Sequence, residues 1–507
     1  MKVFLTGIAM AVMLLPAANA GAASKGVAIN AKNFPNQSIR QEMDDVYDSN
    51  GDGRLSKAEA KKVKKLRLST RVLGYETDDK EKDISLKGIQ YFTGLQELSV
   101  STGVDGNITD ANLSKNRELK KIDIDCKKLK GFRINTNNLE SVDMHINSIE
   151  GGKLTIKNAK KLRKAEVCGK RVKTMDFSGS SIRNLDLTWS EGVKNVKLKG
   201  CSKLKKIEAF QTSISKLNLS SATQLQELRI MSSKLTKLDV SHNKKLKSIN
   251  VSCNKLTNLD VSANKQLEYL DCMGNRLKKF SVSKNKKLKG LVVSSNRLTT
   301  LNVSRNKQLE YLYIADNKLS KIDVTHNKKL TTISYPDNQF KKALVPNASK
   351  LKKLYCGGNP FTKLDLSKCA KLKKLSIADS QMSTIDVSGC KALEELDASG
   401  SALTDLDLQA NKKLRRLEVA YTKKLLRIDV SGNTKLHDLY CNKSAVQEID
   451  MRNCLKVRDD DEEGGGLEFY KCQSLKKIYV SEQWKELDYF QKQADKENLN
   501  IEWIVAQ

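Results

Sequence analysis

The sequence predicts a repeat solenoid of short parallel strands, because it has a regular leucine period, two asparagine columns and terminal segments that depart from the period. A leucine recurs every 21 residues from Leu204 to Leu414, and one extra residue moves the next to Leu436. In such a chain each coil buries its apolar side only against neighbouring coils. We therefore expect one long domain, although 507 residues would otherwise suggest about three globular ones.

Each coil of the predicted solenoid has two similar halves. In the coil that begins at Leu267, residues Leu270 and Cys272 point inward in the first half, and Phe280 and Val282 do so in the second. An Asn closes each half. One column holds Asn254, Asn275, Asn296, Asn317, Asn338 and Asn359, and the other holds Asn243, Asn264, Asn285, Asn306 and Asn327. An Asn amide both donates and accepts, so stacked Asn side chains can satisfy turn backbone groups that lack a strand partner.

This LxxLxLxxNxL pattern resembles the leucine-rich repeat in its bacterial 21-residue form with nested halves. The resemblance is regular over residues 204–436 and less regular over 95–203, so we assign 95–456 to the repeats. It implies a β-solenoid, or horseshoe, whose short parallel strands line the concave side.

A calcium-loop sequence, DSNGDGRLSKAE, occupies residues 48–59 ahead of the repeats. An EF-hand loop offers oxygen ligands at alternate positions and at its last residue, with Gly at the sharp turn. The matching residues are Asp48, Asn50, Asp52, the carbonyl of Arg54, Ser56 and Glu59, with Gly53 at the turn. The alternative is an Asn/Asp/Gly turn without metal. Because every position is filled, we expect Ca²⁺ as the cofactor.

Segments 21–94 and 457–507 are expected to cap the two ends of the solenoid. The first resembles the start of secreted internalin-like proteins, whose repeats follow a small helical cap of EF-hand ancestry. That resemblance implies a structural ion that fastens the cap. At the other end, SEQWKELDYFQKQADKENLN predicts an amphipathic helix with Trp484, Leu487 and Phe490 facing inward.

The first 20 residues have the pattern of a secretory signal peptide. Lys2 precedes an apolar run at 3–16, and small residues allow cleavage after Ala20. No other stretch is apolar enough to cross a bilayer. We expect a secreted, extracellular protein, free or held non-covalently at a cell surface, without membrane insertion. Unlike internalins, the chain shows no immunoglobulin-like region or wall-sorting signal, so covalent attachment to a wall is not expected.

Eight of the eleven cysteines fall at two positions of the repeat pattern. Inward strand positions hold Cys272, Cys356 and Cys441, and asparagine positions hold Cys201, Cys369, Cys390, Cys454 and Cys472. Small buried thiols suit both places, and parallel neighbours point alike, so mostly reduced thiols are favoured over disulfides. Zinc is disfavoured because there is no CxxC motif and the four histidines are scattered.

Catalysis is not expected, and no catalytic residue is assigned. His145, His242, His326 and His437 fall in different coils, and no HExxH or GxSxG motif occurs. The acidic run at 458–466 is interpreted as a solvated loop.

Two surfaces remain as candidates for ligand binding. The net charge of +32 includes two columns of cations, each beside an asparagine column. One holds Lys244, Lys265, Lys286, Lys307 and Lys328, and the other holds Lys234, Lys255, Arg276, Arg297 and Lys318. Coils about 4.8 Å apart bring these like charges together, and a polyanion would relieve their repulsion. A solvated face that keeps the repeats soluble explains part of this pattern.

The second surface is the strand face, where outward positions hold Tyr269, Tyr311, Tyr313, Tyr355 and Tyr440. Exposed tyrosines suit protein or glycan recognition, although they also have high strand propensity. A further column, Asp239, Asp260, Asp323, Asp365, Asp386 and Asp407, is expected to bond to local backbone and pair with lysines.

The sequence therefore predicts a monomeric, non-enzymatic secreted protein that binds a protein, an acidic glycan or a cell-wall polymer. Nucleic acid is not an expected target outside the cell. The alternative is a passive structural component of a surface layer or matrix.

Overall fold

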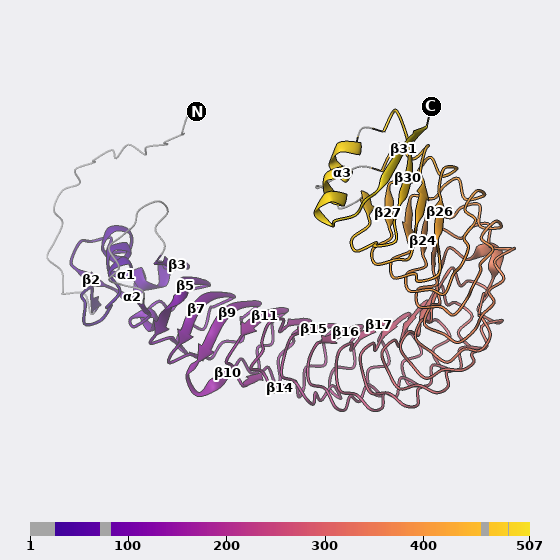
Figure 1. Cartoon of the computed structure of the whole chain (residues 1–507). Coiled ribbons are helices and arrows are strands. Elements are labelled where there is room, and N and C mark those ends of the chain that lie inside the picture. The colour runs from indigo at the N-terminus through magenta and orange to yellow at the C-terminus, as the bar shows by residue number, and fades with distance from the viewer. Residues whose placement is uncertain (1–25, 71–82, 458–465, 485, 507) are drawn as a thin grey trace.

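The computed structural model describes residues 26–70, 83–457, 466–484 and 486–506, so the predicted signal peptide and most of the acidic run lie outside the described residues. Figure 1 shows a long curved solenoid with a small cap at its N-terminal end and helix α3 (Leu487–Lys496) at the other. The main sheet follows the inner side of the curve, and shorter sheets lie on the outer side. The predicted parallel-strand solenoid is confirmed.

The inner sheet contains one strand from each coil, and every pairing is parallel. Its strands are β3 (Lys65–Ser69), β4 (Ile84–Ser85), β5 (Glu97–Thr109), β7 (Lys121–Leu129), β9 (Ser141–Ile149), β11 (Lys164–Gly169), β13 (Asn184–Asp186), β15 (Lys206–Phe210), β16 (Glu227–Met231), β17 (Ser248–Asn250), β18 (Tyr269–Asp271), β19 (Gly290–Val292), β20 (Tyr311–Tyr313), β21 (Thr332–Ser334), β22 (Lys353–Tyr355), β23 (Lys374–Ser376), β24 (Glu395–Asp397), β25 (Arg416–Glu418), β27 (Asp438–Tyr440) and β29 (Gly466–Glu468). Both β3 and β4 pair with β5, and from there each strand pairs with the next in this order.

In the part of the chain that the structure describes, strands pair on the outer side only near the two ends of the solenoid. Its strands are β6 (Asn112–Leu113), β8 (Arg133–Ile134), β10 (Lys153–Thr155), β12 (Thr174–Asp176), β14 (Asn195–Lys197), β26 (Arg427–Asp429), β28 (Glu448–Asp450), β30 (Lys477–Ser481) and β31 (Glu502–Ala506). Short 3₁₀ helices lie at η2 (Ile89–Tyr91), η3 (Glu150–Gly152) and η4 (Ala348–Lys350). Among the described residues, no helix combines the length and the apolar character needed to cross a membrane.

The N-terminal cap packs directly on the first coil. It contains β1 (Val27–Ala28), α1 (Gln37–Glu42), the π-helix η1 (Met43–Tyr47), β2 (Arg54–Leu55) and α2 (Lys57–Lys62). The Asn36 side chain accepts from the Ile39 amide at 3.0 Å and so caps α1. Phe34 stacks on Phe92 of the first coil with ring centroids 5.9 Å apart. This contact packs the N-terminal segment against the first coil.

The C-terminal segment packs aromatic side chains against the last coils. Trp484 and Phe490 are buried, and their rings stack 5.3 Å apart. The indole Nε1 of Trp484 donates to the carbonyl of Val457 at 2.7 Å. Leu487 is partly buried against the same core.

The leucines of the period form the centre of the core. Leu204, Leu225, Leu246, Leu267, Leu288, Leu309, Leu330, Leu351, Leu372, Leu393, Leu414 and Leu436 are all 0% exposed. Burial of a leucine side chain stabilises a fold by about 2 kcal/mol, so this column supplies a large share of the hydrophobic stabilisation.

The two asparagine columns differ in their hydrogen bonds, which the sequence pattern did not predict. We call the column of Asn254 to Asn359 the inner ladder, because it follows the inner strands, and the column of Asn243 to Asn327 the outer ladder. In the inner ladder, the amide of Asn275 donates to the carbonyls of Val251 and Cys272, and its Oδ1 accepts from Leu256 N at 3.0 Å. Inner-ladder side chains therefore use both ends of the amide.

The outer ladder uses only the amide NH₂ group. Asn285 Nδ2 donates to the carbonyls of Val261 and Asn264 at 2.9 Å each, and Asn285 Oδ1 is buried with no partner. The other Asn residues of this ladder show the same unpartnered Oδ1. A thiol can replace such a donor: Cys201 and Cys454 donate to the carbonyls of Phe177 and Val430 at 3.1 Å.

Candidate functional site

The calcium-loop sequence forms a tight turn between η1 and α2. Gly53 adopts a φ of 68°, in the left-handed region that favours Gly. The Gly53 amide donates to Asp48 Oδ2 at 2.8 Å, and the Arg54 amide donates to Asp52 Oδ1 at 2.9 Å. The acidic side chains at the start of the loop therefore already turn toward its interior.

Glu59 lies at the end of this loop and is 4% exposed. Its carboxylate accepts from the backbone amides of Ser49 and Ser56, each at 2.9 Å, and Ser56 caps helix α2. Burial alone would raise the pKa of Glu59. The hydrogen bonds from Ser49 and Ser56 outweigh burial and lower the pKa to about 2. The carboxylate is therefore ionised, as a calcium ligand must be.

The oxygen atoms that the loop offers as ligands suit a hard cation such as Ca²⁺. Asp48 Oδ1 is buried and has no hydrogen-bond partner, so one acceptor is left for an ion. All six predicted ligands offer oxygen, the ligand atom that Ca²⁺ prefers. Asp48, Asn50, Asp52, the Arg54 carbonyl, Ser56 and Glu59 would hold the ion.

The predicted cation columns lie at the turns that follow the inner and outer halves of each coil. All ten side chains, from Lys234 to Lys328, are exposed. None of them forms an ion pair within 4.0 Å in the described part of the chain. The structure therefore lines these charges up along the solenoid without neutralising them.

Neighbouring lysines on the outer-ladder turn pair with neutral side chains. Lys245, Lys287 and Lys329 donate to the side-chain oxygens of Gln224, Gln266 and Gln308, one coil earlier. By contrast, lysines beside the inner strands pair with acids. Lys289 lies 2.8 Å from Glu268, and Lys373 lies 2.8 Å from Glu394. Positive charge is therefore retained at the turns and balanced near the inner sheet.

Four of the five predicted tyrosines lie on nearby strands of the inner sheet. Tyr269 and Tyr311 stack with ring centroids 6.4 Å apart, and Tyr311 lies 5.8 Å from Tyr313. Gly290 lies between Tyr269 and Tyr311 in the strand register, and a Cβ there would overlap the Tyr311 ring. Tyr355 follows Tyr313 in its column after one intervening strand. Tyr269, Tyr311 and Tyr313 therefore form a partly exposed aromatic cluster, and Tyr355 lies beyond Ser334 in the same column.

The expectation of an exposed Tyr440 is wrong. Tyr440 is 7% exposed, because the guanidinium of Arg416 lies over its ring at 4.6 Å. The neighbouring coil therefore covers this side chain, and it does not extend the aromatic surface.

The predicted aspartate column bonds to local backbone, as expected. Asp239 Oδ1 accepts from the Ser241 amide at 2.9 Å, and Asp260, Asp323, Asp365, Asp386 and Asp407 accept in the same way from the amide two residues on. The expected pairing of these six carboxylates with lysines within 4.0 Å is not observed among the described residues.

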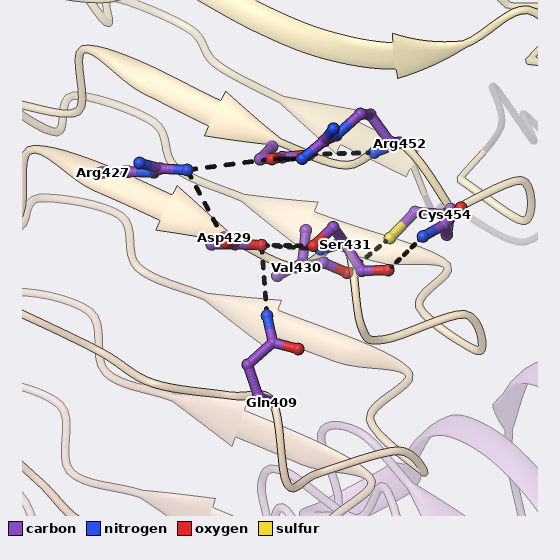
Figure 2. A network of polar contacts seen from close by, with 9 residues as sticks. Gln409, Arg427, Asp429, Val430, Ser431, Arg452 and Cys454 are labelled. Carbon is purple, nitrogen blue, oxygen red and sulfur yellow. Dashed lines mark hydrogen bonds and ion pairs between the residues drawn. The ribbon is translucent and has the colours of Figure 1, made fainter. Parts of the chain in front are cut away.

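In the last coils, the aspartates of this column pair with arginines. Figure 2 shows Asp429 between Arg427, at 3.8 Å, and Gln409, at 3.4 Å. The next residue in the column, Asp450, is buried and accepts two hydrogen bonds from Arg452, at 2.8 and 2.9 Å. Arg427 of β26 also lies 3.9 Å from Asp450 of β28, so this ion pair links the two strands.

All eleven cysteines are free thiols in this structure. Cys253 is exposed and Cys168 is half-buried, whereas the other nine are buried. Burial raises the pKa of Cys272 and of Cys356, the latter to about 12. These thiols fill the core.

Sequence reasoning missed a second aromatic cluster near the C-terminal end. The Lys443 ammonium lies over the rings of Tyr421 and Tyr470, at 5.1 and 5.9 Å from their centroids. Tyr421 and Lys443 both adopt left-handed φ angles, at the turn position that holds one such residue in each coil. Following this turn position from coil to coil in the sequence, as was done for the strand positions, could have identified Tyr421 and Lys443 as neighbours.

No family model matches the chain, and no curated protein matches it. Solved structures with a similar fold include the functional domain of InlJ from Listeria monocytogenes, which includes a cysteine ladder. The two sequences are 23% identical. The match covers 91% of this chain and 83% of the InlJ domain, with a TM-score of 0.48. A leucine-rich repeat protein of Leptospira interrogans is 19% identical, and the match covers 63% of this chain and 90% of that protein, with a TM-score of 0.49. The leucine-rich effector YopM of Yersinia pestis is 19% identical, and the match covers 59% of this chain and 83% of YopM, with a TM-score of 0.46.

The strand register and the buried leucine column define this chain as a leucine-rich repeat solenoid with a 21-residue coil. A solenoid of this class presents extended side-chain columns to solvent.

Proposed function

We propose that this chain is a secreted, non-enzymatic binding protein whose cation columns hold an acidic glycan or a phosphate-rich wall polymer. The observation that supports this proposal is the unpaired state of the columns. Among the residues that the structure describes, the ten exposed cations have no acidic partner within 4.0 Å, and the lysines beside the outer column pair with Gln instead of Glu. A face needed only for solubility would be served as well by mixed charges, which repel less.

The periodicity of the columns suits a polymer. Successive cations of one column follow each other by one coil, which is one strand spacing of about 4.8 Å. At such separations in water, like charges repel by about 1 kcal/mol per pair before salt screening. A polyanion laid along the column would replace this repulsion with attraction and release its own counterions.

The test is the salt dependence of binding of the full chain to a sulfated glycosaminoglycan and to a poly(glycerol phosphate). We expect the dissociation constant to rise steeply with salt. Changing Lys244, Lys265, Lys286, Lys307 and Lys328 to Gln should weaken binding and flatten this dependence. A matched control changes five lysines that are already ion-paired, namely Lys65, Lys206, Lys289, Lys373 and Lys374.

The control separates the effect of the cation columns on affinity from the effect of net charge, because both variants lose five positive charges. Equal losses in the two variants would mean that net charge alone drives the association. Affinity that does not depend on salt, or that survives neutralisation of the column, would contradict the proposal. Absence of saturable binding to any polyanion or protein would favour a passive structural component.

A second candidate function is protein binding at the aromatic surface of Tyr269, Tyr311, Tyr313 and Tyr355. The stacked arrangement of Tyr269 and Tyr311 favours it, because rigid rings lose little side-chain entropy on contact. A Tyr311→Ser variant should then weaken binding of a protein partner and leave the salt dependence of polyanion binding unchanged.

We also propose secretion and a structural calcium site. The signal-peptide pattern of residues 1–20 supports the first. The six oxygen donors and the unpartnered Asp48 Oδ1 support the second. With a dissociation constant of about 0.1 to 1 mM, an extracellular site would stay largely occupied, so the ion would hold the cap and not switch it.

A further inference from the structure

Three metal-binding side chains come together on the inner sheet near its N-terminal end. Asp143 and His145 lie on β9, and Glu166 lies opposite Asp143 on the neighbouring strand β11. One ligand atom from each of the three lies within 4.8 Å of the other two. In the part of the chain that the structure describes, no other group of three His, Cys, Asp or Glu side chains meets this criterion.

The Asp143 carboxylate has a close contact with His145 but an incomplete set of hydrogen bonds among the described residues. Its Oδ1 is inaccessible to solvent and has no hydrogen-bond partner, and it lies 3.4 Å from His145 Nδ1. Burial raises the pKa of Asp143, and the nearby Glu166 carboxylate raises it further. The Lys164 ammonium lies 2.7 Å from one oxygen of Glu166 but makes no ion pair with Asp143 within 4.0 Å. Two carboxylates are therefore held side by side with one acceptor unfilled.

We propose that Asp143, His145 and Glu166 form a binding site for a divalent transition-metal ion such as Zn²⁺. Zinc is bound in proteins by imidazole nitrogen and by Asp or Glu oxygen, commonly with three protein ligands and one open position. An imidazole also distinguishes this site from the oxygen-only calcium loop. Because the three side chains lie on the inner sheet, the remaining coordination position would face the concave side, where a bound partner or water could fill it.

Cys168 is next to His145 in the strand register, but it is not one of the proposed ligands. Its thiol donates toward the carbonyl of Trp189 at 3.6 Å. The sequence argument against zinc considered only cysteines and clustered histidines. Here two of the three ligands are carboxylates, and one of them comes from the next coil.

The test is a calorimetric titration of the full chain with Zn²⁺, in excess Ca²⁺ so that the calcium loop does not take up zinc. Every variant carries Cys253→Ser, because Cys253 is the exposed thiol. We expect one site, and at least about a tenfold loss of affinity in His145→Ala and in Glu166→Gln, since even indirect support of a metal ligand is worth 10- to 100-fold.

The matched control is His326→Ala. His326 has the same side-chain exposure as His145, 55%, and lies 3.7 Å from Asp323, but it has no third ligand nearby. We expect this variant and Cys168→Ser to bind Zn²⁺ as the parent does. Circular dichroism checks that each variant is folded, and an exposed position such as His145 should tolerate alanine.

Unchanged affinity in His145→Ala would overturn the proposal, and so would an equal loss in His326→Ala. A loss in Cys168→Ser as large as that in His145→Ala would also overturn the proposed set of three ligands. None of these results bears on polyanion binding, because the cation columns and this cluster share no residue.

Discussion

The difference between the two asparagine ladders predicts that one substitution has unequal effects at two positions of the same coil. We compare Asn275→Cys in the inner ladder with Asn285→Cys in the outer ladder. At Asn275, cysteine removes the Oδ1 that accepts from the buried Leu256 amide at 3.0 Å. At Asn285, the lost Oδ1 has no partner, and the thiol can donate to Val261 O as Cys454 donates to Val430 O.

The magnitude follows from the partner that is left behind. A buried backbone N–H without an acceptor costs about 1 to 3 kcal/mol, whereas loss of an unpaired oxygen costs nothing of this kind. The amide NH₂ bonds three carbonyls at Asn275 and two at Asn285, and a thiol can keep one of them in each variant, so the additional loss at Asn275 adds to the difference. We therefore expect Asn275→Cys to be the less stable of the two by about 1 to 3 kcal/mol.

Urea denaturation followed by circular dichroism measures the difference, and hydrogen exchange locates it. The Leu256 amide should lose protection in Asn275→Cys and keep it in Asn285→Cys. Because both positions lie in one coil, differences in regional stability along the solenoid do not enter. Equal destabilisation, or a Leu256 amide that stays protected in Asn275→Cys, would refute the reasoning.

Three further predictions concern the calcium loop and the aromatic surface. Asp48→Ala combined with Glu59→Ala should lower the melting temperature of the cap in calcium and expose it to protease while the regular repeats stay folded; altered ligand affinity at unchanged stability would indicate a sensor instead. Because the folded-state pKa of Glu59 is lowered from 4.5 to about 2, its contribution to cap stability should be complete above pH 4.5 and be lost as the pH falls toward 2. Hydrogen exchange of the cap across this range should therefore show a pH dependence that Glu59→Gln removes. Gly290→Ala should displace the Tyr311 ring, which a changed near-ultraviolet circular dichroism spectrum would report, and an unchanged spectrum would argue against the stacked pair.

The regular part of the fold could be predicted from sequence because its period is constant. Every leucine of the column is buried, and the cation columns lie where counting places them. The same counting fails before Leu204, where coil lengths vary. Ser141 pairs with Lys164, 23 residues on; Lys164 pairs with Asn184, 20 on; and Asn184 pairs with Lys206, 22 on. Without a fixed period, sequence alone could not place Glu166 beside Asp143.

Other features depend on contacts that a column pattern does not contain. The pattern gave Tyr440 an outward position, but burial depended on Arg416, whose side chain is long enough to reach over the ring from the preceding inner strand. The unlike roles of Asn275 and Asn285 depend on whether a backbone amide faces the side-chain oxygen, and the residue type is the same in both.

The fixed register of the inner strands also determines which changes of length this gene can accept. In the regular repeats each strand residue pairs with the residue 21 positions later, so duplicating or deleting 21 codons returns every side chain to an equivalent place. A change of any other length must be absorbed locally, as with the extra residue before Leu436, where the inner strands β25 and β27 pair at 22 positions. Reading-frame-preserving exchange between coils would therefore lengthen or shorten the cation columns in whole steps, and natural variants of this gene should differ in length mainly by multiples of one coil.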